Sequence, residues 1–125
     1  MSRKIRLTKQ KVVIEKELIN FKTFFTADDL LQKIKAKDKK IGIATIYRFL
    51  KDKTIKNEIH SYYCDRKQIY STTKNNHCHF ICSKCGKTTH FNIKDLDFMK
   101  GSIQGKICHF QIDLTGICNK CSKID

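Results

Sequence analysis

The sequence predicts an α+β protein with an N-terminal winged helix-turn-helix and a small C-terminal α/β unit that contains a four-cysteine zinc site. Three observations support this fold class. Three helix-period segments precede two short β-like runs, the composition changes to Cys, His and β-formers after Asn75 and Asn76, and two C-x-x-C pairs follow. We therefore expect two domains, residues 1–74 and residues 75–125.

The first two helices are predicted from apolar periodicity. Residues 10–21 place Ile14, Leu18 and Phe21 on one stripe. A second helix is expected to begin at Thr26, a good N-cap residue, with Asp28 and Asp29 in the first turn, where carboxylates meet the helix dipole favourably. Its apolar face comprises Leu30, Leu31 and Ile34.

A third helix is predicted to follow Gly42. Its apolar residues recur at i, i+3, i+4 and i+7, namely Ile43, Ile46, Tyr47 and Leu50. The opposite face is small, hydroxylated and cationic, with Tyr47 at its edge; it comprises Ala44, Thr45, Arg48 and Lys51. This strip is the candidate DNA-binding surface.

Residues 59–64 and 68–72 read as two strands joined by the polar turn Asp65, Arg66 and Lys67. Three helices and a hairpin make a winged helix, in which the third helix enters the major groove and the basic hairpin tip reaches backbone or minor groove. Arg48 and Lys51 are therefore candidate DNA contacts. The alternative is an ordinary surface helix beside an edge hairpin.

Charge and cysteine content narrow the class of protein. The net charge is +14, and residues 1–72 carry 18 basic and 8 acidic side chains, which gives +10. Such a field attracts nucleic acid or anionic membrane. No segment approaches a membrane span and the N-terminus has no secretion signal, so we expect a cytoplasmic protein. Seven cysteines then favour metal ligation over disulfides.

The C-terminal region contains one clear strand and two cysteine pairs. Phe110, Ile112 and Leu114 alternate with polar residues, which is typical of a half-buried strand. The pairs, separated by 32 residues, supply four thiolates for a closed tetrahedral zinc site, formed by Cys82, Cys85, Cys118 and Cys121. Redox dithiols or disulfides are the alternative; a redox pair needs a helix N-terminus, whereas Gly86 follows the first pair as in a knuckle turn.

A histidine cluster adjoins the first cysteine pair. In a strand, His77 and His79 project from one face, so two imidazoles can bind one ion. His90 is a candidate third ligand. Cys78 would face the other way and is expected to pack or to serve as a reserve thiol.

Three ordered stretches resemble the ferric uptake regulator family over nearly the whole chain. They are IGIATIYRFL (41–50), HCHFICSKCGKTTHF (77–91) and GICNKC (116–121). That family includes iron, zinc, manganese, nickel and peroxide sensors. The resemblance implies a C-terminal dimerisation domain and repression of metal-homeostasis or peroxide-stress genes at double-stranded DNA operators when a regulatory metal is bound.

The resemblance also implies roles for individual residues. The four cysteines fall on the structural zinc positions, Tyr47 and Arg48 on DNA-contacting positions, and His77, His79 and His90 on regulatory-ligand positions, the last of which is normally Asp or Glu. Fe²⁺ or Zn²⁺, and also Mn²⁺, are the regulatory metals this site implies. Peroxide sensing is a variant in which iron held by histidines promotes oxidation of the imidazoles.

The sequence departs from the family pattern at several positions. RLTKQK replaces L-T-P-Q-R, Phe24 stands at a frequent His ligand position, Ser71 at a frequently acidic one and Phe110 at one that is commonly His. Replacement ligands are sought among His60, Cys64, Cys108 and His109. Thiol ligands would favour zinc over ferrous iron, whereas a set of His and oxygen donors leaves iron or manganese open.

Two functions from other classes compete with a homodimeric repressor. An open site of His77, His79 and His90 would suit a small zinc hydrolase, but no general base is apparent: the nearest downstream carboxylates are Asp95 and Asp97. A zinc module without regulation, acting as a nucleic-acid or protein adaptor, would bind its partner independently of a second metal.

Overall fold

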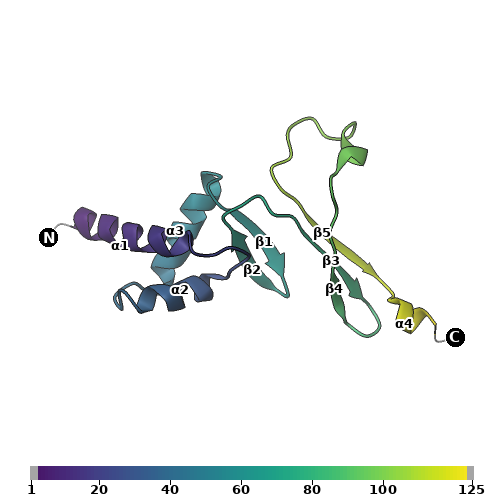
Figure 1. Ribbon diagram of the computed structural model, residues 1–125, viewed down its shortest axis with the longest axis horizontal. Coiled ribbons are helices and arrows are strands. Elements are labelled where there is room, and N and C mark those ends of the chain that lie inside the picture. Colours follow the sequence, from purple (N-terminus) through teal and green to yellow (C-terminus); the bar gives the residue numbers. More distant parts are fainter. Residues whose placement is uncertain (1–2, 124–125) are drawn as a thin grey trace. The chain divides into compact units, whose positions relative to one another are not determined.

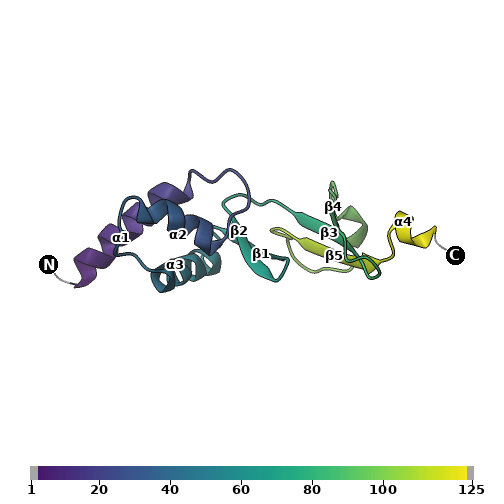
Figure 2. The same ribbon diagram turned by 90° about the horizontal axis from the view of Figure 1, so that it is seen from below.

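The computed structural model describes residues 3–123, with side chains described from residue 9 to residue 123. The chain divides into two compact units, Met1–Lys74 and Asn75–Asp125. Figures 1 and 2 show the helices and the hairpin of the first unit and the separate sheet of the second. The elements are α1 (Arg3–Leu18), α2 (Ala27–Lys35), α3 (Ile43–Ile55), β1 (His60–Cys64), β2 (Lys67–Ser71), β3 (His77–Cys82), β4 (Thr88–His90), the 3₁₀ turn η1 (Asp97–Met99), β5 (Gln111–Gly116) and α4 (Asn119–Ser122).

The three predicted helices are present, and two of them begin where their caps predict. Thr26 caps α2 through a capping box, because its hydroxyl accepts from the Asp29 N–H at 3.1 Å and the Asp29 carboxylate accepts from the Thr26 N–H at 2.9 Å. Gly42 is the N-cap of α3. These local signals fix both helix starts.

Helix α1 differs from its predicted bounds of 10–21. It begins at Arg3 and ends at Leu18, and its last turn closes with a bond from the Phe21 N–H to the Leu18 carbonyl at 3.2 Å. Phe21 thus lies outside the helix, where its ring stacks on that of Phe25 at a centroid distance of 4.6 Å. The apolar contact predicted for Phe21 is kept because it packs on the same core after the helix has ended.

The core of the N-terminal unit lies between the three helices and the hairpin. Its side chains come from the three helices, from β2 and from the segments that connect them, and include Ile14, Leu30, Ile34, Ile46, Leu50 and Tyr70. Tyr47, predicted on the apolar stripe of the third helix, is half exposed at 50%, and Phe49 is buried instead. This position of Tyr47 leaves its ring on the polar face of α3.

The hairpin β1–β2 is antiparallel and pairs Cys64 with Lys67. Its turn therefore consists of Asp65 and Arg66 alone, both at positive φ (51° and 66°), not of the three residues predicted. A two-residue turn of this kind matches the twist of the strands. Phe25 adds a bridge to Tyr70 on β2, so the hairpin is tied to the helices through backbone hydrogen bonds of 3.0 and 2.8 Å.

The C-terminal unit contains a three-stranded sheet in the order β4-β3-β5. Strand β4 pairs antiparallel with β3, and β5, the predicted alternating strand, pairs parallel with it. Among residues 3–123, no helix is long and apolar enough to cross a membrane. The α+β fold class predicted from the sequence is confirmed.

Candidate metal centre and recognition helix

The two C-x-x-C pairs meet at one end of the C-terminal sheet. The sulfur atoms of Cys82, Cys85, Cys118 and Cys121 all lie within 4.8 Å of one another, and those of Cys85 and Cys118 are 3.9 Å apart. In a tetrahedral site with Zn–S bonds of 2.3 Å, the sulfurs lie about 3.8 Å apart. The four thiols therefore fit one zinc ion.

Sheet pairing explains how two distant pairs come together. Cys82 ends β3, opposite Gly116 at the end of β5. The Ser83 N–H donates to the Gly116 carbonyl at 2.8 Å, so the turn after β3 is fixed to the turn after β5. Gly86, at φ +77°, closes the first turn and donates to the Cys82 carbonyl at 2.9 Å. Glycine adopts this left-handed backbone without the steric cost that a Cβ atom adds.

Backbone donors tune the thiols toward metal binding. The N–H groups of Cys118 and Cys85, pointing at Cys82 Sγ from 3.4 and 3.5 Å, lower the pKa of that thiol to about 6. The pKa of Cys118 is also lowered, first by the Cys121 N–H. The neighbouring thiols, of which Cys118 has the largest effect, raise the pKa of Cys121 to about 12. A group of four sulfurs needs a bound cation before all four lose their protons.

The second pair has a feature that the sequence analysis missed. Cys118 is the N-cap of the short helix α4, so this pair does lie at a helix N-terminus, the setting that a redox pair requires. The helix has only four residues, Asn119–Ser122. Because the sulfurs of both pairs form one group of four, shared metal ligation accounts for the arrangement better than two separate dithiols do.

Three histidines lie together on the same sheet. The ring centroids of His77 and His79 on β3 are 5.2 Å apart, and the ring of His90 on β4 lies 5.2 Å from the first and 5.8 Å from the second. One ligand nitrogen of His77 lies within 4.8 Å of one of His90. The imidazoles are less tightly gathered than the four sulfurs, but they share one face and offer nitrogen ligands that divalent metals accept.

A carboxylate that the sequence analysis missed lies beside them. Oδ1 of Asp113 on β5 is 3.0 Å from Nδ1 of His79. Asp95 and Asp97, the carboxylates nearest downstream in sequence, lie in and before η1 instead. The alternation of residues 110–115 marked a strand, but its parallel pairing with β3, which brings Asp113 opposite His79, had no signal in the sequence.

The departures from the family pattern have structural counterparts. Phe24 packs edge-on against Tyr62 at a centroid distance of 5.1 Å, and buried Ser71 contacts the Thr73 hydroxyl at 3.2 Å. Cys78 is buried, and burial raises the pKa of its thiol. The suggested replacement ligands lie on β1 (His60 and Cys64) and just before β5 (Cys108 and His109), and their role as ligands stays a prediction.

Helix α3 presents the predicted strip. Ala44, Tyr47, Arg48 and Lys51 are exposed, and Thr45 is half-buried. The Arg48 guanidinium donates to the Thr45 hydroxyl at 3.3 Å, which orients it along the helix face. These side chains are available to base edges and phosphates.

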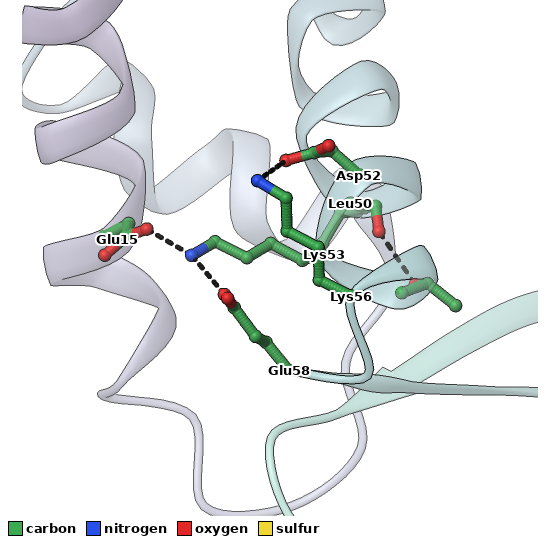
Figure 3. A network of polar contacts seen from close by, with 7 residues as sticks. Glu15, Leu50, Asp52, Lys53, Lys56 and Glu58 are labelled. Atoms are coloured by element: carbon green, nitrogen blue, oxygen red, sulfur yellow. Dashed lines mark hydrogen bonds and ion pairs between the residues drawn. The ribbon is translucent and has the colours of Figure 1, made fainter.

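An ion-pair network fixes α3 relative to its neighbours in the N-terminal unit (Figure 3). The Lys53 ammonium contacts Glu15 of α1, and it donates to Glu58, just before β1, at 2.6 Å. Hydrogen bonds to these two carboxylates, Glu15 first, raise the pKa of Lys53, whose side chain is only 18% exposed. Helix α3, the predicted recognition helix, is thereby fixed to α1 and to the segment that leads into β1.

Together, the winged helix and the four-cysteine group define a metal-binding, nucleic-acid-binding class of protein. The chain matches the ferric uptake regulator family over residues 2–115, and it belongs to that family. It is a metal-dependent transcriptional regulator of the repressor type. The resemblance drawn from the three motifs is confirmed.

Individual relatives agree with this assignment. The chain is 32% identical to the peroxide-responsive repressor PerR of Staphylococcus epidermidis (95% of this chain, 83% of that protein) and 29% identical to the peroxide operon regulator of Bacillus subtilis (95% and 86%). The ferric uptake regulator Fur of Helicobacter pylori has a similar fold, with a TM-score of 0.60 at 24% identity over 90% of this chain and 82% of that one.

Proposed function

We propose that this chain is a cytoplasmic, homodimeric repressor whose affinity for double-stranded DNA operators is set by a second divalent metal. Zinc in the group Cys82, Cys85, Cys118 and Cys121 builds the C-terminal unit, and Fe²⁺ or Zn²⁺, with Mn²⁺ as a further candidate, binds at His77, His79 and His90. The observation that carries the proposal is the placement of these three imidazoles on one sheet face, in the same unit as the four sulfurs.

The N-terminal unit supplies the DNA contacts in this proposal. Residues 1–72 carry a net charge of +10, and the exposed strip of α3 combines the cations Arg48 and Lys51 with the hydroxyls of Thr45 and Tyr47 beside Ala44. Cations bind phosphates, whereas a guanidinium also reads guanine edges in the major groove. Arg66 and Lys67 at the wing tip add a second cationic contact.

The C-terminal unit supplies the dimer contact. Strand β5 is an edge strand, so one row of its backbone groups faces away from the sheet. Leu114 on this strand is 47% exposed, and Phe98 in η1 is 76% exposed. A second copy that covers these apolar groups would remove them from water.

Catalysis is not part of this proposal. A zinc hydrolase needs a general base that is free to activate water. The Asp113 carboxylate beside the histidine cluster contacts a ring nitrogen of His79 directly. Its oxygen is therefore engaged with a candidate ligand, which favours a sensing site over a catalytic one.

The proposal is tested by measuring DNA binding as a function of the second metal. Protein that carries only the structural zinc is mixed with Mn²⁺ and a randomised DNA library under anaerobic conditions, and the duplexes that it binds are selected. Affinity for the selected duplex is then measured while Fe²⁺, Mn²⁺ or Zn²⁺ is added separately. We expect tight, palindrome-specific binding only with the second metal, and its loss in His79→Ala.

The outcomes separate the competing functions. Equal binding with and without the second metal would indicate an adaptor or an uncontrolled DNA-binding protein. Hydrolysis of a model phosphodiester that disappears in His79→Ala would indicate an enzyme. The Fe²⁺ form is also treated with peroxide. Loss of DNA binding, together with an added oxygen that mass spectrometry detects on His77 or His79, would identify the protein as a peroxide sensor.

A further inference from the structure

A row of potential metal ligands crosses all three strands of the C-terminal sheet. Strand β3 aligns His79 with His90 on the antiparallel neighbour β4 and with Asp113 on the parallel neighbour β5. Residues directly opposite each other on adjacent strands have their side chains on the same face. His77 lies two residues before His79 and therefore shares that face.

The contact between Asp113 and His79 resembles two ligands of one ion more than a hydrogen bond. Their Oδ1 and Nδ1 atoms are 3.0 Å apart, yet among the described residues the buried His79 Nδ1 has no acceptor aligned with it for a hydrogen bond. Two donor atoms each about 2.1 Å from one ion, at angles between octahedral and tetrahedral, lie about 3.0–3.4 Å apart. The observed separation falls in that range.

The carboxylate is held in place by its own strand. The Gln111 amide, which lies opposite His77 in the pairing of β3 with β5, donates to Asp113 Oδ1 at 3.3 Å. The Asp113 side chain is 54% exposed, so it is not part of a packed core. Such an oriented, partly solvated carboxylate is suited to metal ligation.

The geometry points to Asp113 as a ligand of the regulatory metal, beside His77, His79 and His90. This inference rests on the proposed function, because it completes the same site. Asp113 supplies an oxygen donor from the C-terminal unit itself. In the family pattern, ligands also come from two positions of the N-terminal unit, which Phe24 and Ser71 occupy in this chain. Three imidazoles and one carboxylate form a donor set that accepts Fe²⁺ and Mn²⁺ as well as Zn²⁺.

The test compares Asp113→Ala with a matched control, Asp97→Ala, which removes an exposed carboxylate from the same unit. Full-length protein carrying one zinc per chain is titrated with Mn²⁺ and with Co²⁺ against a competing chelator, and the visible d–d spectrum of Co²⁺ is recorded. We expect Asp113→Ala to weaken both metals by at least about tenfold and to change the Co²⁺ spectrum. Asp97→Ala should match the parent protein in both measurements.

Several results would overturn the inference. Parent-like affinity and spectrum in Asp113→Ala, while His79→Ala abolishes binding, would remove Asp113 from the site and leave the proposed function intact. Weakened affinity with an unchanged Co²⁺ spectrum would show that Asp113 acts only by positioning His79. A parent protein that binds no second metal would overturn the proposed function, and the inference would fail with it. Retention of one zinc per chain shows that each variant is folded.

Discussion

The two units of this chain are stabilised in different ways. The N-terminal unit buries apolar side chains from three helices and the hairpin, among them Ile14, Leu30, Ile46 and Tyr70. In the described part of the C-terminal unit, the buried apolar side chains are those of Cys78 and Cys82, whereas Phe98, Ile103, Ile107, Leu114 and Ile117 are exposed. A unit of this size with so little core needs a metal or a partner chain. Hydrophobic burial thus stabilises the N-terminal unit, and we expect metal ligation to stabilise the C-terminal unit.

The largest expected effect comes from removing a zinc ligand. Cys85→Ser leaves three thiolates, and because a structural zinc site of this kind contributes about 10 kcal/mol or more of binding free energy to folding, we expect the C-terminal unit to unfold. The N-terminal unit should stay folded. Zinc content and amide NMR spectra of the two units measure both effects.

The matched control is Cys108→Ser, which removes an exposed thiol of the same unit outside the group of four. It should keep one zinc per chain and a parent-like spectrum. Equal loss of zinc in both variants would contradict the assignment of the four ligands.

Truncation of a core side chain tests whether hydrophobic burial stabilises the N-terminal unit. Leu30→Ala removes a fully buried side chain from the N-terminal core, and we expect a loss of about 2–5 kcal/mol in the free energy of unfolding of that unit. Zinc content should not change. Ile55→Ala, at a side chain that is 71% exposed on α3, should change this free energy by less than about 0.5 kcal/mol in the same urea titration.

A smaller effect is expected from one charge on the predicted DNA-binding strip of α3. Lys51→Ala should weaken binding to the selected duplex and to unrelated DNA alike. The slope of the logarithm of the association constant against the logarithm of the salt concentration should fall by about one, as expected for the loss of one phosphate contact. Fluorescence anisotropy at several salt concentrations measures this slope. Lys106→Ala makes the same charge change at an exposed position in the C-terminal unit, and a matching loss there would show that only net charge matters.

The smallest effect concerns acid stability of the N-terminal unit. A hydrogen bond from Lys37 is the main cause that lowers the pKa of Glu17 below 4.5, against the opposing effect of burial. The ionised form therefore stabilises the fold above pH 4.5, and this contribution is lost as the pH falls through the lowered pKa. Urea unfolding across this range should show a weaker pH dependence in Glu17→Gln. An identical pH profile in the variant would remove Glu17 as a cause.

Local signals predicted much of the fold. Thr26 and Gly42 carry their own capping information, so the starts of α2 and α3 could be predicted from the sequence. The end of α1 could not, because Phe21 contacts the core whether or not it is helical. Periodicity likewise placed Tyr47 on the apolar stripe, although packing buries Phe49 instead.

In the candidate site, too, local sequence patterns predicted some residues, whereas residues brought in by strand pairing could not be predicted. Spacing alone indicated the four cysteines, because each C-x-x-C pair forms its own turn, and the H-x-H pair follows from strand alternation. Asp113 could not be found in this way, since it lies opposite His79 only through the parallel register of two strands separated by a long connection. Helix α4, for which Cys118 is the N-cap, was missed because it has only four residues.

Hydrogen exchange before and after zinc removal tests the contrast between the two units most directly. Exchange of backbone amides is followed by mass spectrometry in the reduced chain with zinc and with a strong chelator. Protection should disappear across residues 75–123 on zinc removal and persist in α1, α2 and α3. Loss of protection in both units together, or its retention in both, would contradict the account.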